Sequence, residues 1–372
     1  MTDNRKYDAK LVEAIRAKEH FAQRDGLQML MKPIPDDSRE HVLDPRVRAT
    51  VERKRKMFAD RAQKRFGAFS LADERYRPDK VTYDLTSEPI LQNEQLIDVN
   101  STHKIDVFTY CRSERQTSRA AIVFLHGGGY TAGNERIYHN QMLFLAEKSN
   151  AVVVFPEYRL APECPFPGAI EDCYATVEWL ANNAEEIGID SSKIMVGGDS
   201  AGGSLTLSCL LEDQERAHVI SRAYLLFPGT DVSDYRSAGL YDWSWDYYPI
   251  DEEERDLVQN RINRIKKTSD NPYGGPTNLW IQGKTTLDDP LVSPVYASDD
   301  QLRKFSPITV AVSEYDFLRI AAEYLARRLV KLGRPVRPVM YCGCDHGFLD
   351  LFGTEPQAEE VCMDIADEAG RM

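Results

Sequence analysis

Short apolar runs recur along most of the chain and alternate with longer stretches in which apolar residues return every three or four positions. The runs have the length and β-branched content of buried parallel strands, and they cover residues 121–125, 151–155, 193–197, 224–227, 308–312 and 336–341. The helix-like stretches between them cover residues 137–149, 169–184, 201–214 and 320–333. Strands separated by helices of this length predict βαβ crossovers, and therefore an α/β fold with a mostly parallel central sheet flanked by helices.

The N-terminal residues have a different pattern. Residues 11–15 and 20–31 carry apolar side chains at helical spacing, and a proline-containing stretch follows them. Residues 46–66 hold nine basic and two acidic residues, and on a helix they would turn Val47, Val51 and either Met57 or Phe58 inward. We therefore predict a helical N-terminal region. Its basic helix would have a solvated face, although a nucleic-acid-binding or nuclear-targeting segment has a similar composition.

Charge and composition decide against that alternative. Of the 372 residues, 59 are acidic and 46 are basic, which gives a formal net charge of −13. Such a chain repels polyanions, so we expect no nucleic-acid partner and no stable membrane association. The N-terminus lacks the apolar segment of a secretory signal, and the seven cysteines are scattered. Reduced thiols and a cytoplasmic location follow as expectations.

One long stretch interrupts the alternation of strands and helices. Residues 231–288 are rich in acidic and aromatic side chains, and five aromatic residues crowd into positions 241–248. We interpret this stretch as an insertion above the sheet. The predicted division is an N-terminal helical cap or extension (1–80), a first part of the core (81–230), a cap insertion (231–288) and a second part of the core (289–372).

The sequence Gly198-Asp199-Ser200-Ala201-Gly202 lies between a predicted strand and a predicted helix. In that setting a G-x-S-x-G pattern predicts a strained turn that lifts the serine hydroxyl above the sheet edge, with glycines where a Cβ atom would clash. The helix N-terminus also places a backbone N–H and a positive dipole end near the serine. An ordinary glycine-rich turn is the alternative. No lysine follows the glycines, which argues against a phosphate-binding loop.

A second glycine motif, His126-Gly127-Gly128-Gly129-Tyr130, directly follows the strand at 121–125. Consecutive glycines let bare backbone N–H groups point at an oxygen that gains negative charge during a reaction. His126 stands at the root of this loop, and we do not expect it to transfer protons.

The base and its orienting acid should follow later strands. His346 comes after the last long strand, in the loop Cys344-Asp345-His346-Gly347-Phe348, where an open α/β sheet assembles its site. Glu314 and Asp316 follow the strand at 308–312, and their spacing does not choose between them. Asp345 is adjacent to the histidine and poorly placed to reach its Nδ1.

A metal site is a competing interpretation of the same region, because Cys342, Cys344 and His346 could bind zinc. No second pair of cysteines or histidines has metal-site spacing, and the histidine is needed as a base. We therefore predict no metal and no cofactor.

Six motifs together make the sequence resemble the hormone-sensitive-lipase-like family of esterases, over roughly residues 81–372. They occur in the order that this family shows, and they are HGGGY, EYRLAPECPFPGAIED, GDSAGG, DPLVSP, SEYDFLR and DHGF. The resemblance implies the α/β-hydrolase fold, with an eight-stranded, mostly parallel sheet and a helical cap.

The resemblance also implies roles for particular residues. It makes Ser200 the nucleophile and His346 the base, and it selects Asp316 as the acid. It places the N–H groups of Gly127, Gly128 and Ala201 in the oxyanion hole. Further candidate substrate contacts are Tyr130, Asp199, Trp243 and Trp245.

These expectations describe a serine carboxylesterase that hydrolyses short-chain acyl esters of small molecules through an acyl-enzyme intermediate. An amide or lactone hydrolase with the same triad remains an alternative. So does a small-molecule receptor on the same fold, although receptors of that kind lack the histidine. The sequence also allows a homodimer.

Overall fold

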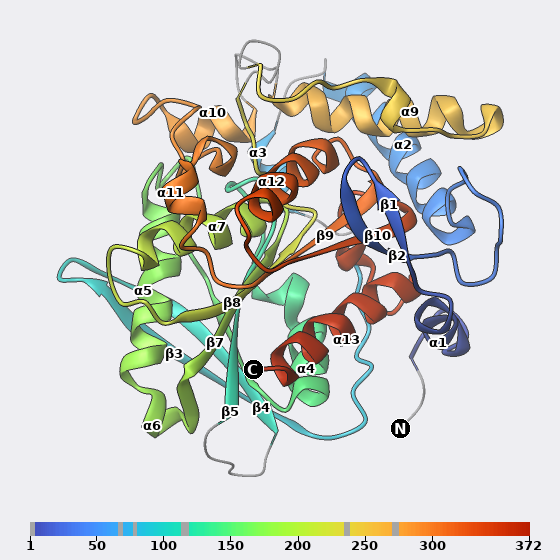
Figure 1. Cartoon of the computed structure of the whole chain (residues 1–372). Helices are drawn as coiled ribbons and strands as arrows, with labels where there is room; N and C mark the ends of the chain where they lie inside the picture. Colours follow the sequence, from blue (N-terminus) through green and yellow to red (C-terminus); the bar gives the residue numbers. More distant parts are fainter. Residues whose placement is uncertain (1–3, 66–69, 77–79, 113–118, 234–238, 270–274) are drawn as a thin grey trace.

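The computed structural model describes residues 4–65, 70–76, 80–112, 119–233, 239–269 and 275–372. Within them lies a ten-stranded sheet with the order β1-β2-β10-β9-β8-β7-β5-β6-β4-β3 (Figure 1). The strands are β1 (His20–Arg24), β2 (Leu27–Lys32), β3 (Ile90–Asn100), β4 (His103–Arg112), β5 (Arg119–Leu125), β6 (Val152–Pro156), β7 (Ile189–Asp199), β8 (Ile220–Leu226), β9 (Ile308–Tyr315) and β10 (Val336–Asp345).

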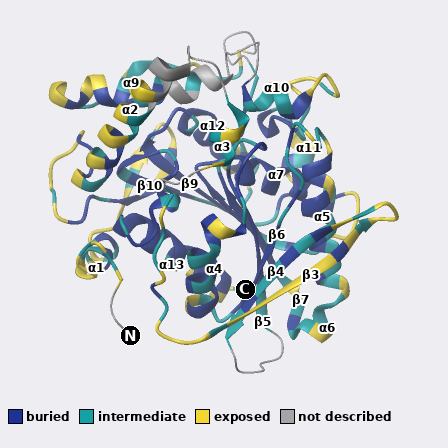
Figure 2. Cartoon of the chain, turned by 180° about the vertical axis from the view of Figure 1, so that it is seen from behind, coloured by how far each residue is buried: buried dark blue, intermediate teal, exposed yellow. Residues whose placement is uncertain are grey.

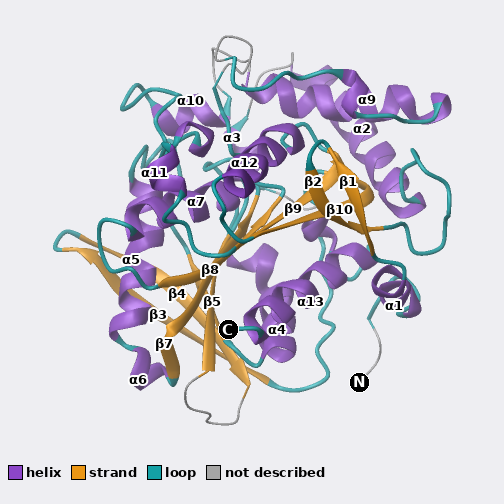
Figure 3. Cartoon of the chain, viewed as in Figure 1, coloured by secondary structure: helices purple, strands orange, loops and turns teal. Residues whose placement is uncertain are grey.

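Helices pack on both faces of this sheet (Figure 3). The longer ones are α1 (Lys10–Ala17), α2 (Pro45–Arg65), α4 (Glu135–Ser149), α5 (Gly168–Asn182), α7 (Ala201–Asp213), α9 (Glu252–Ser269), α12 (Arg319–Lys331) and α13 (Pro356–Gly370). The shorter ones are α3 (Leu71–Arg75), α6 (Ala184–Ile187), α10 (Pro276–Ile281) and α11 (Asp299–Leu302), with 3₁₀ turns η1 (Trp245–Tyr247), η2 (Pro294–Tyr296) and η3 (Phe348–Leu351). No helix in the described residues is both long and apolar enough to cross a bilayer.

The six strands expected from the apolar runs are all present, as β5 to β10. Every neighbouring pair from β2 to β6 in the sheet order is parallel, whereas β1/β2, β6/β4 and β4/β3 are antiparallel. The predicted fold class, a mostly parallel sheet flanked by helices, is confirmed.

Alternation along each strand divides the core into two layers. Val123 and Leu125 of β5 face a layer that includes side chains of α5, α7 and α12. Ile122 and Phe124 face the opposite layer, which includes side chains of α4 and α13. Figure 2 shows the central strands buried, whereas β3 at the sheet edge is largely exposed. This sandwich fixes the carboxyl ends of the parallel strands, from which the site residues project.

The helical prediction for residues 20–31 is wrong, because this segment forms the hairpin β1–β2. Asp25 and Gly26 both have positive φ, at 46° and 82°, and they make the two-residue turn for which Asp-Gly is suited. β2 then pairs in parallel with β10. The family resemblance implied eight strands, and the two extra strands are this hairpin. The N-terminal segment thus extends the sheet as well as contributing helices, and the predicted domain boundaries remain predictions.

Helices α2 and α9 lie side by side at the top of Figure 1, beyond the end of the sheet. The prediction of a helix over residues 46–66 is confirmed through Arg65, with Val47 and Val51 buried and Met57 half-buried. The Phe58 side chain and residue 66 lie outside the described part. Residues 231–288, the predicted cap insertion, contain η1, α9 and α10. Residues 234–238 and 270–274 of this stretch lie outside the description.

Candidate active site

Ser200 occupies the tight turn between β7 and α7. Its φ of 54° and ψ of −116° form a strained conformation for a residue with a side chain. Its N–H donates to the Leu226 carbonyl at 2.9 Å, and its own carbonyl accepts from the Gly229 N–H at 3.1 Å. A Cβ atom on Gly198 or Gly202 would approach the Leu125 carbonyl oxygen to 2.4 or 1.9 Å. The prediction that both positions need glycine because a Cβ atom would clash is therefore confirmed.

The fold brings Ser200, His346 and Asp316 together in a continuous chain of polar contacts. The Ser200 Oγ lies 3.0 Å from the His346 Nε2, and the His346 Nδ1 lies 2.7 Å from the Asp316 Oδ2. Asp316 is fully buried at the end of β9, and its other oxygen accepts from the Leu318 N–H at 3.0 Å. This geometry supplies a hydroxyl with a base, and the base with an orienting carboxylate.

Glu314, the other carboxylate on this strand, faces elsewhere. Its Oε2 accepts the Gly343 N–H at 2.9 Å, and the side chain is buried. The residues alone left Glu314 and Asp316 equivalent, and only Asp316 reaches the imidazole.

The predicted oxyanion donors need one correction. The Gly127 N–H already donates to the Asp199 Oδ1 at 2.8 Å and to the Tyr138 Oη at 3.1 Å, so it is not free to bind an oxyanion. The next two N–H groups, of Gly128 and Gly129, make no hydrogen bond within the described residues. Both glycines have positive φ, at 135° and 62°. Sequence reasoning missed Gly129, because nothing in a run of three identical glycines indicates which two N–H groups are free.

Asp199 does not face the substrate site, contrary to the prediction. It is 3% exposed and reaches from β7 to the Gly127 N–H in the loop after β5, and its carboxylate also accepts from the Tyr138 hydroxyl of α4 at 3.1 Å. Burial, together with the Asp350 carboxylate, raises the pKa of Asp199 to about 6. Gly127 has to be glycine here because a Cβ atom would stand 2.3 Å from the Asp199 Oδ2. Asp199 thus anchors the glycine loop from behind.

The aromatic candidates pack mainly against protein. Tyr130 is 3% exposed and stacks on Trp280 of α10, with ring centroids 3.6 Å apart. That burial gives it little surface for a substrate. Trp243 and Trp245 are half-buried and meet edge to face at 4.9 Å. Trp243 also lies 5.8 Å from Phe317, next to the proposed acid. Substrate contact by the two tryptophans stays a prediction.

Neither His126 nor the Cys342-x-Cys344-x-His346 motif is arranged for the chemistry considered as an alternative above. His126 is fully buried and stacked on Tyr158 at 4.1 Å, as expected for a residue without a proton-transfer role. Both ring nitrogens of His346 are already engaged by Ser200 and Asp316, so the imidazole is not free for the zinc site considered above. In the described part of the chain, no group of three potential ligand side chains could hold a metal ion.

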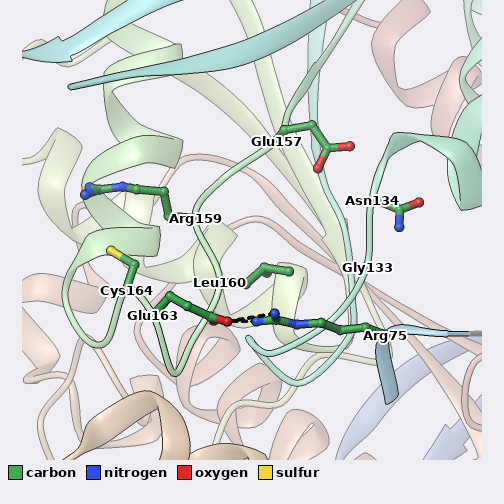
Figure 4. A pocket seen from close by; sticks show the side chains of 8 residues that line it. All are labelled: Arg75, Gly133, Asn134, Glu157, Arg159, Leu160, Glu163 and Cys164. Carbon is green, nitrogen blue, oxygen red and sulfur yellow. Dashed lines mark hydrogen bonds and ion pairs between the residues drawn. The ribbon is translucent and has the colours of Figure 1, made fainter. Parts of the chain in front are cut away.

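A cavity of about 560 Å³ lies beside the far end of the glycine loop, between residues 133–134 and 157–164. Figure 4 shows the ion pair between Arg75 and Glu163 crossing one side of it, at 2.5 Å. Arg75 also donates to the carbonyls of Thr131 and Ala161. None of the predicted site residues lines this cavity, and the contacts of Arg75 support the glycine loop from outside.

Comparisons with known proteins agree with this architecture. Residues 122–350 match the family described as having the α/β hydrolase fold. An arylesterase from Saccharolobus solfataricus is 29% identical over 242 residues, covering 63% of this chain and 70% of that protein. An acetyl esterase from Salmonella enteritidis is 28% identical over 266 residues, covering 70% and 75%.

A solved structure is also similar over most of the chain. A fungal esterase from Rhizomucor miehei superposes with a TM-score of 0.70 at 25% identity, covering 90% of this chain and 97% of the other. The family match spans more than half of the chain and contains Ser200, Asp316 and His346. The chain therefore belongs to the hormone-sensitive-lipase-like family of the α/β-hydrolase fold and is a carboxylic ester hydrolase.

Proposed function

We propose that this enzyme is a serine carboxylesterase in which Ser200 is the nucleophile, His346 the base and Asp316 the orienting acid. The observation that carries the proposal is the unbroken contact chain from the Ser200 Oγ through both ring nitrogens of His346 to the Asp316 carboxylate. An acceptor at Nδ1 holds the proton there and leaves Nε2 free to accept the serine proton.

Acyl transfer then proceeds in two steps. As the Ser200 Oγ bonds to the ester carbonyl carbon, its proton moves to the His346 Nε2. The C–O bond to the alcohol breaks with transfer of that proton to the leaving oxygen. Water next attacks the acyl-enzyme and gives a proton to the same nitrogen. That proton passes to the Ser200 Oγ as the bond between Oγ and the acyl carbon breaks, which releases the carboxylic acid and regenerates the Ser200 hydroxyl. None of these steps uses a metal or a cofactor.

The proposed oxyanion donors are the N–H groups of Gly128, Gly129 and Ala201. Ala201 is the first residue of α7, so the positive end of a 13-residue helix adds to its N–H. The anchoring of Gly127 by Asp199 supports the two glycine donors, because it fixes the start of the loop from which they project.

For the substrate, we propose short acyl groups of about two to six carbons on a fairly bulky alcohol, a range in which each buried CH₂ adds about 0.8 kcal/mol of binding. The half-buried rings of Trp243, which lies near Phe317, and of Trp245 beside it support this proposal. Rigid aromatic side chains there would shorten an acyl channel and offer flat faces to a leaving group. The names of the related acetyl esterase and arylesterase indicate the same kind of substrate.

The test is kcat/KM across nitrophenyl esters from acetate to palmitate, with the nitroanilide of the preferred acid as an amide control. We expect a maximum at short chains and little amide turnover. A steady rise up to twelve or sixteen carbons would show an open acyl groove. Faster turnover of the anilide would favour an amide hydrolase instead.

We also propose that the enzyme works in the cytoplasm on small molecules, without a nucleic-acid partner or stable membrane association. A homodimer is an assembly that the sequence allows. All seven cysteines are free thiols, and the net charge of −13 disfavours polyanions. Sedimentation of the purified protein measures the assembly directly.

A further inference from the structure

A buried charge cluster lies directly behind the proposed base. Asp345, the residue before His346, is 1% exposed, and its Oδ2 accepts from the Arg261 Nε at 2.7 Å. The Lys54 Nζ lies 3.7 Å from the same oxygen. Arg261 also donates through its Nη2 to the backbone carbonyl of His346 at 2.8 Å. Arg261 therefore holds the segment that carries the imidazole at two points, the Asp345 side chain and the His346 backbone carbonyl.

The two cations come from different parts of the cap. Lys54 lies on α2 in the N-terminal segment, and Arg261 lies on α9 in the insertion. These helices run side by side above the sheet (Figure 1). Both side chains are largely buried, at 15% and 13% exposed. Asp345 is thus the point at which both cap segments meet the loop of the proposed base.

The charge of Asp345 depends on these partners. Burial alone would raise the pKa of this carboxyl, but Lys54 and then Arg261 outweigh the burial and lower it. A fully buried carboxylate is costly unless it is paired and hydrogen-bonded. The carboxylate therefore favours the arrangement in which α2 and α9 are both docked beside it.

We propose that Arg261 and Lys54 are positioning residues, which hold His346 in line with Ser200. Arg261 of α9 binds the Asp345 carboxylate and the His346 backbone carbonyl, and Lys54 of α2 binds the Asp345 carboxylate. The inference rests on the proposed triad and adds to it a function for the basic helix and the insertion. Undocking of either cap helix would loosen the base, and a misplacement of about 1 Å costs about 10²-fold in rate.

The decisive variant is Arg261→Met, which keeps the length of the side chain and removes its charge and donors. We expect kcat on a nitrophenyl ester to fall about 10- to 100-fold with KM nearly unchanged. The rate at which a fluorophosphonate labels Ser200 should fall in parallel. Lys54→Met should lower kcat less, because the Lys54 Nζ lies farther from the Asp345 Oδ2 than the Arg261 Nε does. Arg255→Met is the matched control on α9, since Arg255 is exposed and pairs only with Glu252 in the described residues.

The split between kcat and KM separates positioning from a general loss of structure. A misplaced His346 weakens only the transition state, so kcat and kcat/KM should fall together in Arg261→Met while KM stays nearly unchanged.

Double variants test whether the contacts act through one loop. The combined loss in Arg261→Met with Asp345→Asn should be smaller than the product of the two single losses. If Arg261→Met fails to fold, Arg261→Lys takes its place, since it keeps the cation but cannot reach both acceptors, and an intermediate kcat is expected.

Wild-type kcat in Arg261→Met and Arg261→Lys would overturn the inference, and so would an increase in KM alone. These results would leave the proposed triad intact as long as Ser200→Ala abolishes turnover. Persistent turnover in Ser200→Ala would instead remove the proposed function itself.

Discussion

Single residues decide the chemistry of this site, and the sequence predicted them unevenly. Ser200 and His346 stand in motifs whose glycines have a steric reason, so they could be identified before the fold was known. Gly127 could not be assigned correctly, because its N–H donates to Asp199 across neighbouring strands. That contact depends on the register of β5 against β7, which sets Leu125 beside Gly198. Neither the HGGGY motif nor the GDSAGG motif specifies this register.

The choice of acid gives a prediction at this scale. Asp316→Asn should lower kcat by about 10⁴, because an amide at Nδ1 favours the wrong imidazole tautomer. Glu314→Gln is the matched control on the same strand. It should cost far less activity, since Glu314 holds the Gly343 N–H and does not reach the imidazole. Steady-state kinetics on a nitrophenyl ester measure both, and the opposite ranking would show that the acid is misassigned.

At the scale of elements, buried strands were predictable and edge strands were not. The central strands are apolar on both faces, so their runs stand out in the sequence. β3 is almost entirely exposed and has no comparable run. The hairpin β1–β2 was mistaken for a helix because its apolar spacing fits both periods, although the Asp25-Gly26 turn was a hairpin signal.

A buried lysine of β2 joins the hairpin to helix α13. The Lys32 Nζ is 2.8 Å from the Glu360 Oε1 and 3.7 Å from the Asp364 Oδ1, and its side chain is 2% exposed. Lys32→Met should lower the free energy of unfolding by about 3 kcal/mol, because it leaves buried carboxylates less compensated. Lys104→Met, which breaks the exposed pair with Asp98, should cost less than about 1 kcal/mol. Urea unfolding compares the two, and equal losses would contradict a structural role for the hairpin.

A second element-scale prediction concerns Glu355, just before α13. Burial, and then the Asp345 carboxylate, raise its pKa from 4.5 to about 8. The folded protein therefore holds this proton more tightly than the unfolded chain does, and stability falls as pH rises from about 4.5 to about 8. Glu355→Gln lacks this titration, so its Tm relative to the unmutated protein should rise across that window and level off above it. A Tm difference that is independent of pH would show that Glu355 does not titrate there.

At the scale of the whole molecule, the alternation of strands and helices was enough to predict the fold class, and six motifs in order were enough to predict the family. The way in which the cap meets the core was not predictable. Lys54, Arg261 and Asp345 are far apart in the sequence, and each looks like an ordinary surface charge until the fold buries all three together. Long-range pairing of charges leaves no periodic signal in a single chain.

The most direct test of the central claim is covalent labelling of the purified enzyme with a fluorophosphonate, followed by peptide mass mapping. We expect a single modified residue, Ser200, and loss of ester turnover in proportion to labelling. Ser200→Ala should fold, remain unlabelled and lose turnover by a factor on the order of 10⁶ in kcat, whereas Ser204→Ala, one turn along the same helix, should still be labelled. Labelling at another residue, with turnover retained in Ser200→Ala, would contradict the assignment of the nucleophile and of the whole site.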